Sequence, residues 1–484
     1  MLSRWESVRL CGICLMISLI CNFPAGVMNA AVNTAFHEFR RFLRTSFGAR
    51  GISLEDDQRE TWARSGVLNA WFVGQTVGSF LSPPLAEKYG RRGAFAISIA
   101  AMAAGAFSQF LAAVLSSPEL FVFGRCLAAF FSPLADLCMI TYFQECTPMH
   151  LRGSLSSLGG VGYAAMSSLG MLLGTTGVLG HSFTLLFAVQ WPPVLLSLVF
   201  IFFLPETPKF LACIRGDREA ALRSLTFFQG RQPEHKQQVE EFLHEMEDKD
   251  DEGSSSPVTI KELFTTPALR LSMLLALSVF ILDLPYYPLL QSSTFIFETI
   301  GIKRQVAELT STFIFVCYTA GAIISYFLLD RYPRRRLLLT ASAITGSCLF
   351  AFVVFAESSP WFPALRYASL VAVSMFAFVW GELVTQRYRG LCFGVIFGVF
   401  NVLITATNGA ALLAFEKFGV LSFIPLFIVP YVVVWEFLRR FLPETRGRPP
   451  VEVAAVIRRM CDEKTSVKAA EENERAFRAR EARV

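Results

Sequence analysis

The chain has 484 residues with a formal net charge of +5, and 53% of its residues are hydrophobic while 17% are charged. Soluble domains carry roughly 25% charged residues, so this composition excludes a soluble globular protein. The small positive charge is expected in loops that face anionic lipid headgroups, and it excludes the strongly basic surface of a nucleic-acid-binding protein.

Twelve apolar segments along the chain are each long enough to cross a bilayer, which takes about 20 residues of helix. Helices are expected throughout, because open sheet edges leave backbone groups without partners in lipid. The first segment is too long for the apolar core of a signal peptide, which is about 7–15 residues. The predicted spans lie near residues 8–33, 64–86, 93–115, 119–143, 153–178, 182–204, 270–298, 307–329, 336–357, 363–385, 390–415 and 419–441.

Three motifs recur in the same order, each displaced by roughly 240 residues, which indicates an internal duplication. The matched motifs are Gly90-Arg91-Arg92 with Pro333-Arg334-Arg335, Glu145 and Arg152 with Glu382 and Arg389, and Pro205-Glu206-Thr207 with Pro443-Glu444-Thr445. The duplication predicts an all-α membrane protein of two six-helix halves, with a site between them. We place the halves at residues 1–207 and 269–447, separated by a polar linker with short helices at 208–268 and followed by a charged tail at 448–484.

Basic residues cluster in the loops on one predicted side of the bilayer, which the positive-inside rule makes cytoplasmic. Both termini are then cytoplasmic. The segment 34–63 disagrees, because it is expected outside and yet holds several arginines. It also holds as many acidic residues, so we interpret it as a charge-balanced, folded outer loop.

Acidic and basic residues occupy matching positions at helix ends of both halves on the cytoplasmic side. We predict that they pair across the halves and form a gate that closes this side in one state and breaks in another. The alternative is charge that only sets the topology, or, for Arg125 at the start of the fourth span, a side chain that extends to the membrane surface. The gate candidates are Arg91, Arg92, Arg125, Glu145, Arg152, Glu206, Arg334, Arg335, Glu382, Arg389 and Glu444.

Two carboxylates lie at membrane depth, Asp136 in the fourth span and Asp283 in the seventh. Intramembrane carboxylates are costly, which makes both candidates for function. Asp136 could bind a cationic substrate or a proton; the alternatives are a hydrogen bond to a neighbouring hydroxyl and a helix end closer to the surface. The lone Cys11/Cys14 pair is interpreted as packing residues, and no metal or other cofactor is expected.

The motifs together resemble the sugar-porter branch of the major facilitator superfamily, and most of all the animal facilitative glucose transporters. The resemblance covers about residues 20 to 450, and it implies the major facilitator fold, alternating access and carbohydrate transport. The residues that carry it are Gly26-Val27-Met28-Asn29, Gly90-Arg91-Arg92, Gly124-Arg125, Glu145 to Gly153, Pro205 to Leu211, Thr294 to Glu298, Glu382-Leu383 with Arg389, and Pro443-Glu444-Thr445 with Gly447.

The sequence departs from this family where the family binds sugar. The family's Gln-Leu-Gly on the fifth span aligns with Gly160-Val161-Gly162, and its Gln-Gln-Leu-Ser-Gly-Ile-Asn on the seventh with Ile281–Tyr287. An asparagine on the eighth span falls on or near Tyr318, and one on the eleventh falls on Asn401 if one gap is allowed. Sugar hydroxyls need convergent amide partners, which apolar residues cannot replace. The substrate-binding candidates are Asp136, Gly160, Asp283, Tyr287, Gln291, Tyr318 and Asn401.

We therefore predict a sugar-transporter-like carrier of a small organic solute, either facilitative or linked to protons. The alternatives are a carrier of a cationic or amphipathic metabolite that uses Asp136, and a non-transporting sensor or scaffold. The sequence contains no GxxxxGK[ST] nucleotide loop and no His/Cys metal cluster, so an enzyme is not expected. The expected partners are a small solute and membrane lipid, and the expected location is the plasma membrane.

Overall fold

The computed structural model describes residues 4–52, 57–148, 151–231, 235–241, 243, 265–328, 331–380, 390–444 and 455–460. In these segments the regular elements are all helices. Eight helical stretches among them are long and apolar enough to cross a membrane. Every predicted span contains one or more helices, and the tail lies outside the described residues except for 455–460.

In the first half, α3 supplies two crossings because it bends at Gly90, and the sixth crossing is made of two consecutive helices. A short helix, α2, lies in the loop after the first crossing. The elements are α1 (Arg4–Thr34), α2 (Phe36–Gly48), α3 (Asp57–Leu115), α4 (Pro118–Glu145), α5 (Arg152–Leu173), α6 (Phe183–Ala188) and α7 (Trp191–Phe203).

Two short helices of the linker follow, α8 (Pro208–Cys213) and α9 (Arg218–Gln229). In the second half the seventh crossing is again divided in two, and the twelfth begins with short irregular turns. The elements are α12 (Pro267–Leu282), α13 (Tyr286–Thr299), α14 (Arg304–Leu328), α15 (Arg334–Ser358), α16 (Leu365–Trp380), α17 (Gly390–Phe418), η1 (Gly419–Ser422), η2 (Ile424–Ile428) and α18 (Val429–Phe441).

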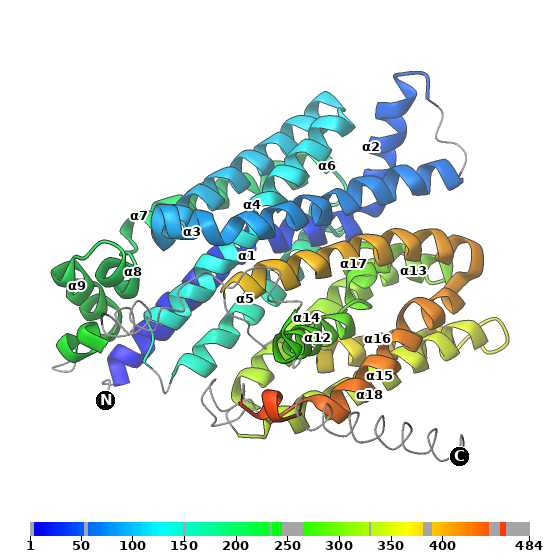
Figure 1. Ribbon diagram of the computed structural model, residues 1–484. Coiled ribbons are helices and arrows are strands. Elements are labelled where there is room, and N and C mark those ends of the chain that lie inside the picture. The colour runs from blue at the N-terminus through cyan, green and yellow to red at the C-terminus, as the bar shows by residue number, and fades with distance from the viewer. Residues whose placement is uncertain are drawn as a thin grey trace, which may run out of the picture.

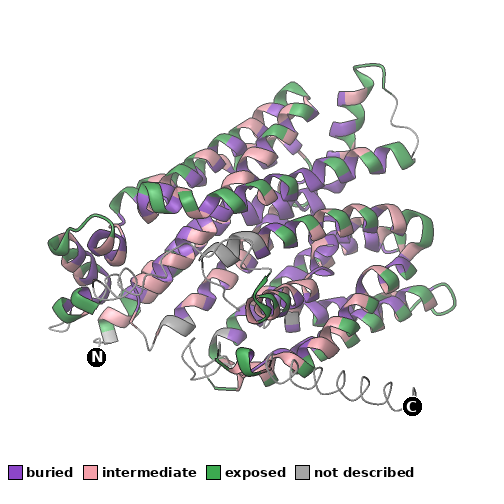
Figure 2. Cartoon of the chain, in the orientation of Figure 1, coloured by how far each residue is buried: buried purple, intermediate pink, exposed green. Residues whose placement is uncertain are grey.

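The two halves lie side by side as bundles of long helices (Figure 1). The N-terminus, α8 and α9 lie at one end of the first bundle, and α2 lies at the opposite end. We call these the linker end and the α2 end. Large apolar side chains such as Phe203, Val371 and Val433 are exposed on the outer faces, while buried residues line the helix contacts (Figure 2). Such apolar outer surfaces are suited to lipid and would be unfavourable in water.

The described part of the charged loop around α2 is folded, and its arginines Arg40, Arg44 and Arg50 are paired with carboxylates. Arg40 and Arg44 both bind the buried Glu60 carboxylate, and Arg50 pairs with Glu119 at the start of α4. The prediction of a charge-balanced, folded loop is therefore confirmed.

The contacts between the halves repeat the internal duplication. The part of α3 before Gly90, which we call its first arm, packs along α17, and α5 packs along α14. The part after Gly90 is its second arm. In terms of crossings, the second meets the eleventh and the fifth meets the eighth. Because the repeat relates the second crossing to the eighth and the fifth to the eleventh, these two interfaces are equivalent, as expected of duplicated halves.

Gly90 divides α3 into two crossings by adopting φ 78° and ψ 166°, a conformation that side chains other than glycine rarely take. A Cβ atom at this position would also collide with the Glu206 carboxylate and lie 2.8 Å from Cε1 of Phe210. The tight turn after the second crossing thus depends on glycine for both backbone conformation and space.

Replacing Gly90 by alanine is expected to destabilise the protein by about 1–3 kcal/mol, because the new side chain combines backbone strain with a collision. Thermal unfolding of the purified protein in detergent would measure this. Gly93→Ala is the matched control, because its Cβ would make only an ordinary 3.6 Å contact with Tyr89. Equal melting temperatures for the two variants would contradict the role assigned to Gly90.

Candidate functional site

At the linker end, Glu206 caps the start of the second arm of α3. Its carboxylate accepts hydrogen bonds from the backbone N–H of Arg91 at 3.0 Å and of Arg92 at 3.1 Å. The Arg91 guanidinium also lies 3.4 Å from the Glu145 carboxylate of α4. A carboxylate at a helix N-terminus satisfies free N–H groups and favours the helix dipole.

The second half repeats this arrangement. Glu444 accepts hydrogen bonds from the backbone N–H of Arg334 at 3.1 Å and of Arg335 at 3.2 Å. The Arg335 side chain donates to the Arg439 carbonyl, just as the Arg92 side chain donates to the backbone of the helix that precedes Glu206. The duplicated motifs therefore form duplicated structures.

These gate contacts lie within one half, whereas we predicted pairs across the halves. The physical reason is that each carboxylate lies beside unsatisfied N–H groups at the start of a helix in its own half. Glu382, Arg389 and the side chain of Arg152 lie outside the described residues, so their predicted part in the gate stays a prediction.

Arg125 does not belong with the gate candidates. It lies near the start of α4, at the α2 end, about 30 Å along the helix from Glu145. Its side chain is fully buried and donates to Asn29 Oδ1 at 2.9 Å and to the carbonyls of Met28 and Leu68. The prediction failed because, in the predicted topology itself, the fourth span begins on the side opposite the turns at Arg91 and Arg334.

Glu206 lies beyond the end of α7, and burial raises the pKa of its carboxyl group, although hydrogen bonds from Thr207, Arg92 and Arg91 oppose this. The folded protein therefore binds the proton of the Glu206 carboxyl group more tightly than the unfolded chain does. The carboxyl group thus contributes stability that is fully present below its unfolded pKa and is lost as the pH rises through its folded pKa.

Glu206→Gln removes this titration. The melting temperature of the variant relative to the unchanged protein is expected to increase between about pH 4 and pH 7. Thermal unfolding in detergent at a series of pH values would test it. A relative melting temperature that decreases over this range would contradict the pKa direction.

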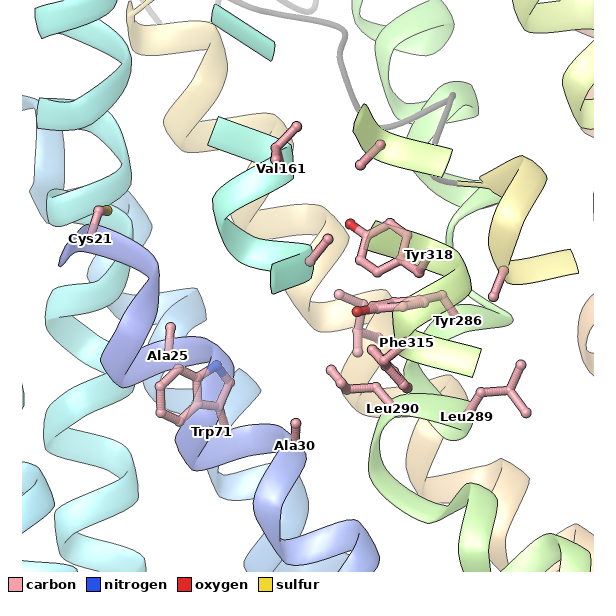
Figure 3. Packing of buried hydrophobic residues seen from close by; sticks show 14 of the residues in the cluster. Cys21, Ala25, Ala30, Trp71, Val161, Tyr286, Leu289, Leu290, Phe315 and Tyr318 are labelled. Carbon is pink, nitrogen blue, oxygen red and sulfur yellow. The ribbon is translucent and has the colours of Figure 1, made fainter. Parts of the chain in front are cut away.

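Aromatic rings fill the middle of the interface between the halves. Tyr286 and Tyr318 lie with ring centroids 5.4 Å apart, and Tyr287 contacts Phe72 of the other half at 5.4 Å and Phe400 at 5.7 Å. Figure 3 shows the hydroxyl groups of Tyr286 and Tyr318 pointing toward the first half, in the direction of α5. Two predicted residues, Tyr287 and Tyr318, are thus brought together. We call the rings of Tyr286, Tyr287, Tyr318, Phe72 and Phe400 the aromatic centre.

The predicted carboxylates near this aromatic centre come from different halves. Asp136 of α4 is half-buried and accepts a hydrogen bond from the Cys21 thiol of α1 at 3.5 Å. Asp283 lies at the break between α12 and α13. Both are close enough to Tyr287 to interact electrostatically with its hydroxyl group.

The remaining central candidates are Gly160 and Asn401. Gly160 is half-buried on α5, next to Val161, which faces the aromatic centre in Figure 3. Asn401 is fully buried on α17, and its amide N–H donates to the Phe397 carbonyl of its own helix at 2.8 Å. No described residue donates to its Oδ1 atom, so this acceptor is available for a ligand.

At the α2 end the halves are joined by hydrogen bonds that converge on α13. Asn33 of α1 donates to the carbonyls of Leu289 and Leu290 at 3.1 and 2.9 Å and to Ser293 Oγ at 2.8 Å, and it accepts from the Thr294 N–H at 3.1 Å. The α13 backbone is non-helical at Ser292, so Asn33 supplies partners to backbone groups next to the break.

Ionic and cation–π contacts surround this junction. His37 lies 2.9 Å from Glu298, and Thr61 donates to Glu416. The buried Arg64 guanidinium lies 4.9 Å from the Phe36 ring and 4.2 Å from the Phe295 ring, which belongs to the other half. The α2 end is therefore closed by contacts between the halves.

Gln291, a predicted candidate, belongs to this end and not to the aromatic centre. It donates to the Leu68 carbonyl at 3.3 Å and accepts from the Asn408 amide at 2.6 Å. Sequence reasoning missed Asn33, Asn69 and Asn408. The signal that could have found them is an amide side chain within an apolar span, which carries a cost similar in kind to that of a carboxylate.

Residues 10–456 match the sequence model of the family described as sugar (and other) transporter. Facilitated glucose transporter member 7 of solute carrier family 2 from Mus musculus is 23% identical over 460 residues, covering 89% of this chain and 86% of the relative. Member 1 from Gallus gallus is 27% identical over 412 residues, covering 79% and 80%.

Among solved structures, the proton:xylose symporter XylE bound to 6-bromo-6-deoxy-D-glucose superposes with a TM-score of 0.70 at 18% identity, covering 92% of this chain and 98% of the other. The inward open conformation of the xylose transporter XylE from E. coli gives a TM-score of 0.68, covering 92% and 99%. These structures confirm the predicted fold of two six-helix halves.

Proposed function

The chain belongs to the family of sugar (and other) transporters, and from this premise we propose where a solute passes and which contacts control its passage. The protein is a sugar-transporter-like carrier that spans the membrane several times and works by alternating access. In our proposal the solute crosses between the halves, past the tyrosines of the aromatic centre and the free Oδ1 atom of Asn401.

The convergence of the α2-end contacts on the interrupted α13 carries this proposal. A carrier with alternating access needs a gate at each end, and broken helices at mid-membrane commonly form its moving parts. Asn33 binds backbone groups of α13 on both sides of its break, so release of Asn33 would free α13 to move. The capped turns of Glu206 and Glu444 are the matching elements at the linker end.

The direct test is uptake of labelled D-glucose, D-xylose and tetraethylammonium into vesicles that contain the purified full chain. Saturable uptake of any of them supports carriage by this protein. No uptake of these or of a wider solute panel, together with a native melting transition, would contradict it and favour a non-transporting sensor or scaffold.

We propose that any proton coupling, or binding of a cationic substrate, runs through Asp136. The observation that favours a role for Asp136 is that its half-buried carboxylate lies at membrane depth and accepts a hydrogen bond from the weakly polar thiol of Cys21. Asp136→Asn preserves the volume of the side chain but removes its titratable group. This variant is expected to abolish the effect of a pH gradient on uptake. Unchanged pH dependence in this variant would remove Asp136 from the mechanism.

We also propose that the linker end is cytoplasmic and that the protein resides in the plasma membrane. The basic turns at Arg91–Arg92 and Arg334–Arg335 support this orientation through the positive-inside rule. In a variant whose partly exposed native cysteines are replaced by serine, a cysteine placed at the exposed Arg215 between α8 and α9 should be labelled by an impermeant maleimide only after cells are permeabilised. Labelling of intact cells would reverse the orientation.

A further inference from the structure

Uncharged polar side chains from both halves line a pocket at the α2 end. Asn69 comes from α3, Gln291 from α13 and Asn408 from α17, and all three are buried. We call these three residues the amide cluster. Ser65 and Ser292 also line the pocket, and its other walls are apolar, formed by Leu68, Pro288, Ile296, Ala411, Leu412, Phe415 and Phe423.

The amide cluster is held together by direct hydrogen bonds across the interface. The Asn408 amide donates to Gln291 Oε1 at 2.6 Å and reaches Asn69 Oδ1 at 3.4 Å, and Asn69 donates to Ser65 Oγ at 3.1 Å. Each primary amide has two N–H donors and a carbonyl oxygen that accepts two hydrogen bonds. The cluster therefore offers more donors and acceptors than its internal contacts use.

This pocket is distinct from the aromatic centre. Asn408 lies about 10 Å further along α17 than Asn401, toward the α2 end. Hydrogen bonds between these amides across the interface offset the desolvation cost of placing them inside a membrane protein. When the halves separate, the same donors and acceptors lose these partners, so the open state needs groups that replace them.

The chemistry of the lining indicates the class of ligand. Donors and acceptors that are all uncharged suit hydroxyl groups, and the apolar walls suit the C–H faces of a small ring or chain. Arg64, the nearest buried cation along α3, is occupied by the rings of Phe36 and Phe295. Gly409 of α17 faces the cluster, because a Cβ there would make an ordinary contact of 3.6 Å with Asn69 Nδ2.

We propose that the amide cluster is a second recognition site of the transport path, which binds a neutral, hydroxyl-bearing solute near the α2 end. When the halves separate there, solute hydroxyl groups replace the hydrogen bonds that Asn408 makes to Asn69 and Gln291. This inference rests on the proposed function, since it places a second substrate contact on the same path.

The test compares D-glucose and D-xylose with their monodeoxy analogues as inhibitors of labelled sugar uptake in vesicles. Asn408→Ala and Gln291→Ala are expected to raise KM at least about tenfold, because each leaves a solute hydroxyl without its partner. Each variant should also stop discriminating against the one analogue that lacks that hydroxyl. Thr407→Val is the matched control on α17, because its hydroxyl bonds the Leu403 carbonyl of its own helix.

Gly409→Ala is the second variant, and it is expected to fold because its methyl group makes ordinary contacts. It should raise KM by narrowing the pocket. If all three variants have the same KM as the Thr407→Val control, the inference is overturned. It is also overturned if a variant changes KM by the same factor for the sugars and for every deoxy analogue, because the cluster would then only hold the gate closed. Uptake of tetraethylammonium but of neither sugar would overturn the inference and leave carriage standing. A complete lack of uptake would contradict both proposals.

Discussion

Replacement of Asn33 by alanine is expected to lower the rate of solute uptake by more than about tenfold while the protein still folds. The variant loses four hydrogen bonds between the halves. The Leu289 and Leu290 carbonyls and the Thr294 N–H on α13 each lose a partner, whereas the Ser293 hydroxyl keeps its hydrogen bond to Ser311. Each buried unsatisfied group costs about 1–3 kcal/mol, so the closed α2 end should become the minor state. Hydrogen exchange of the backbone at residues 288–296 would report the opening, and vesicle uptake the loss of rate.

Asn22→Ala is the matched control for this result. Asn22 is also a buried asparagine of α1, but its amide bonds the Ser18 carbonyl of its own helix and the Gly159 carbonyl of α5, within one half. It should cost stability without faster exchange in α13. If both variants change exchange in α13 equally, Asn33 has no special part in closing the α2 end.

Replacement of Arg125 by methionine is expected to leave the melting temperature unchanged or higher and to reduce uptake by more than about tenfold. The guanidinium is fully buried, and its hydrogen bonds go to neutral acceptors on Asn29, Met28 and Leu68. Burial of a charge costs several kcal/mol, and removal of the Arg125 charge leaves no buried carboxylate without its partner. An apolar side chain of similar volume is therefore expected to be tolerated. The rate of uptake should decrease because the Leu68 carbonyl accepts hydrogen bonds both from Arg125 and from Gln291 of the other half.

Arg125→Lys separates the charge from the hydrogen bonds. Lysine keeps the buried charge but lacks the planar fork that reaches several acceptors, so this variant should melt below both the methionine variant and the unchanged protein. Thermal unfolding and uptake measured on the same preparations would show the two effects apart. A methionine variant that melts well below the lysine variant would mean that Arg125 stabilises the fold instead.

Asn33 and Arg125 have different parts in the structure. Asn33 fixes the interrupted α13 against the first half, whereas Arg125 organises α1, α3 and α4 within that half. The Leu68 carbonyl connects them, because it accepts hydrogen bonds from both Arg125 and Gln291. A change at the α2 end can therefore reach the interior of the first half through a short chain of polar contacts.

The sequence by itself determined the number of crossings, the duplication and the turns at the linker end. Lipid requires each crossing to be a long apolar helix that satisfies its own backbone, so hydropathy alone locates the spans. The places of the turns at Gly90 and Pro333 were predictable from motifs repeated in the chain, whereas Glu206 and Glu444, which cap these turns within each half, were predicted to pair across the halves. Local and periodic features of this kind do not depend on how the helices are rotated.

Only the tertiary structure decided which polar side chains meet. Asn408 lies 117 residues from Gln291 and 339 from Asn69, and the three amides belong to three different apolar spans. The structure likewise placed Gln291 away from the aromatic centre. The rotation and tilt of a membrane helix are set by packing against its neighbours, because lipid solvates every apolar face alike. The polar partners inside the bundle are therefore fixed by the assembly of both halves and not by any single span.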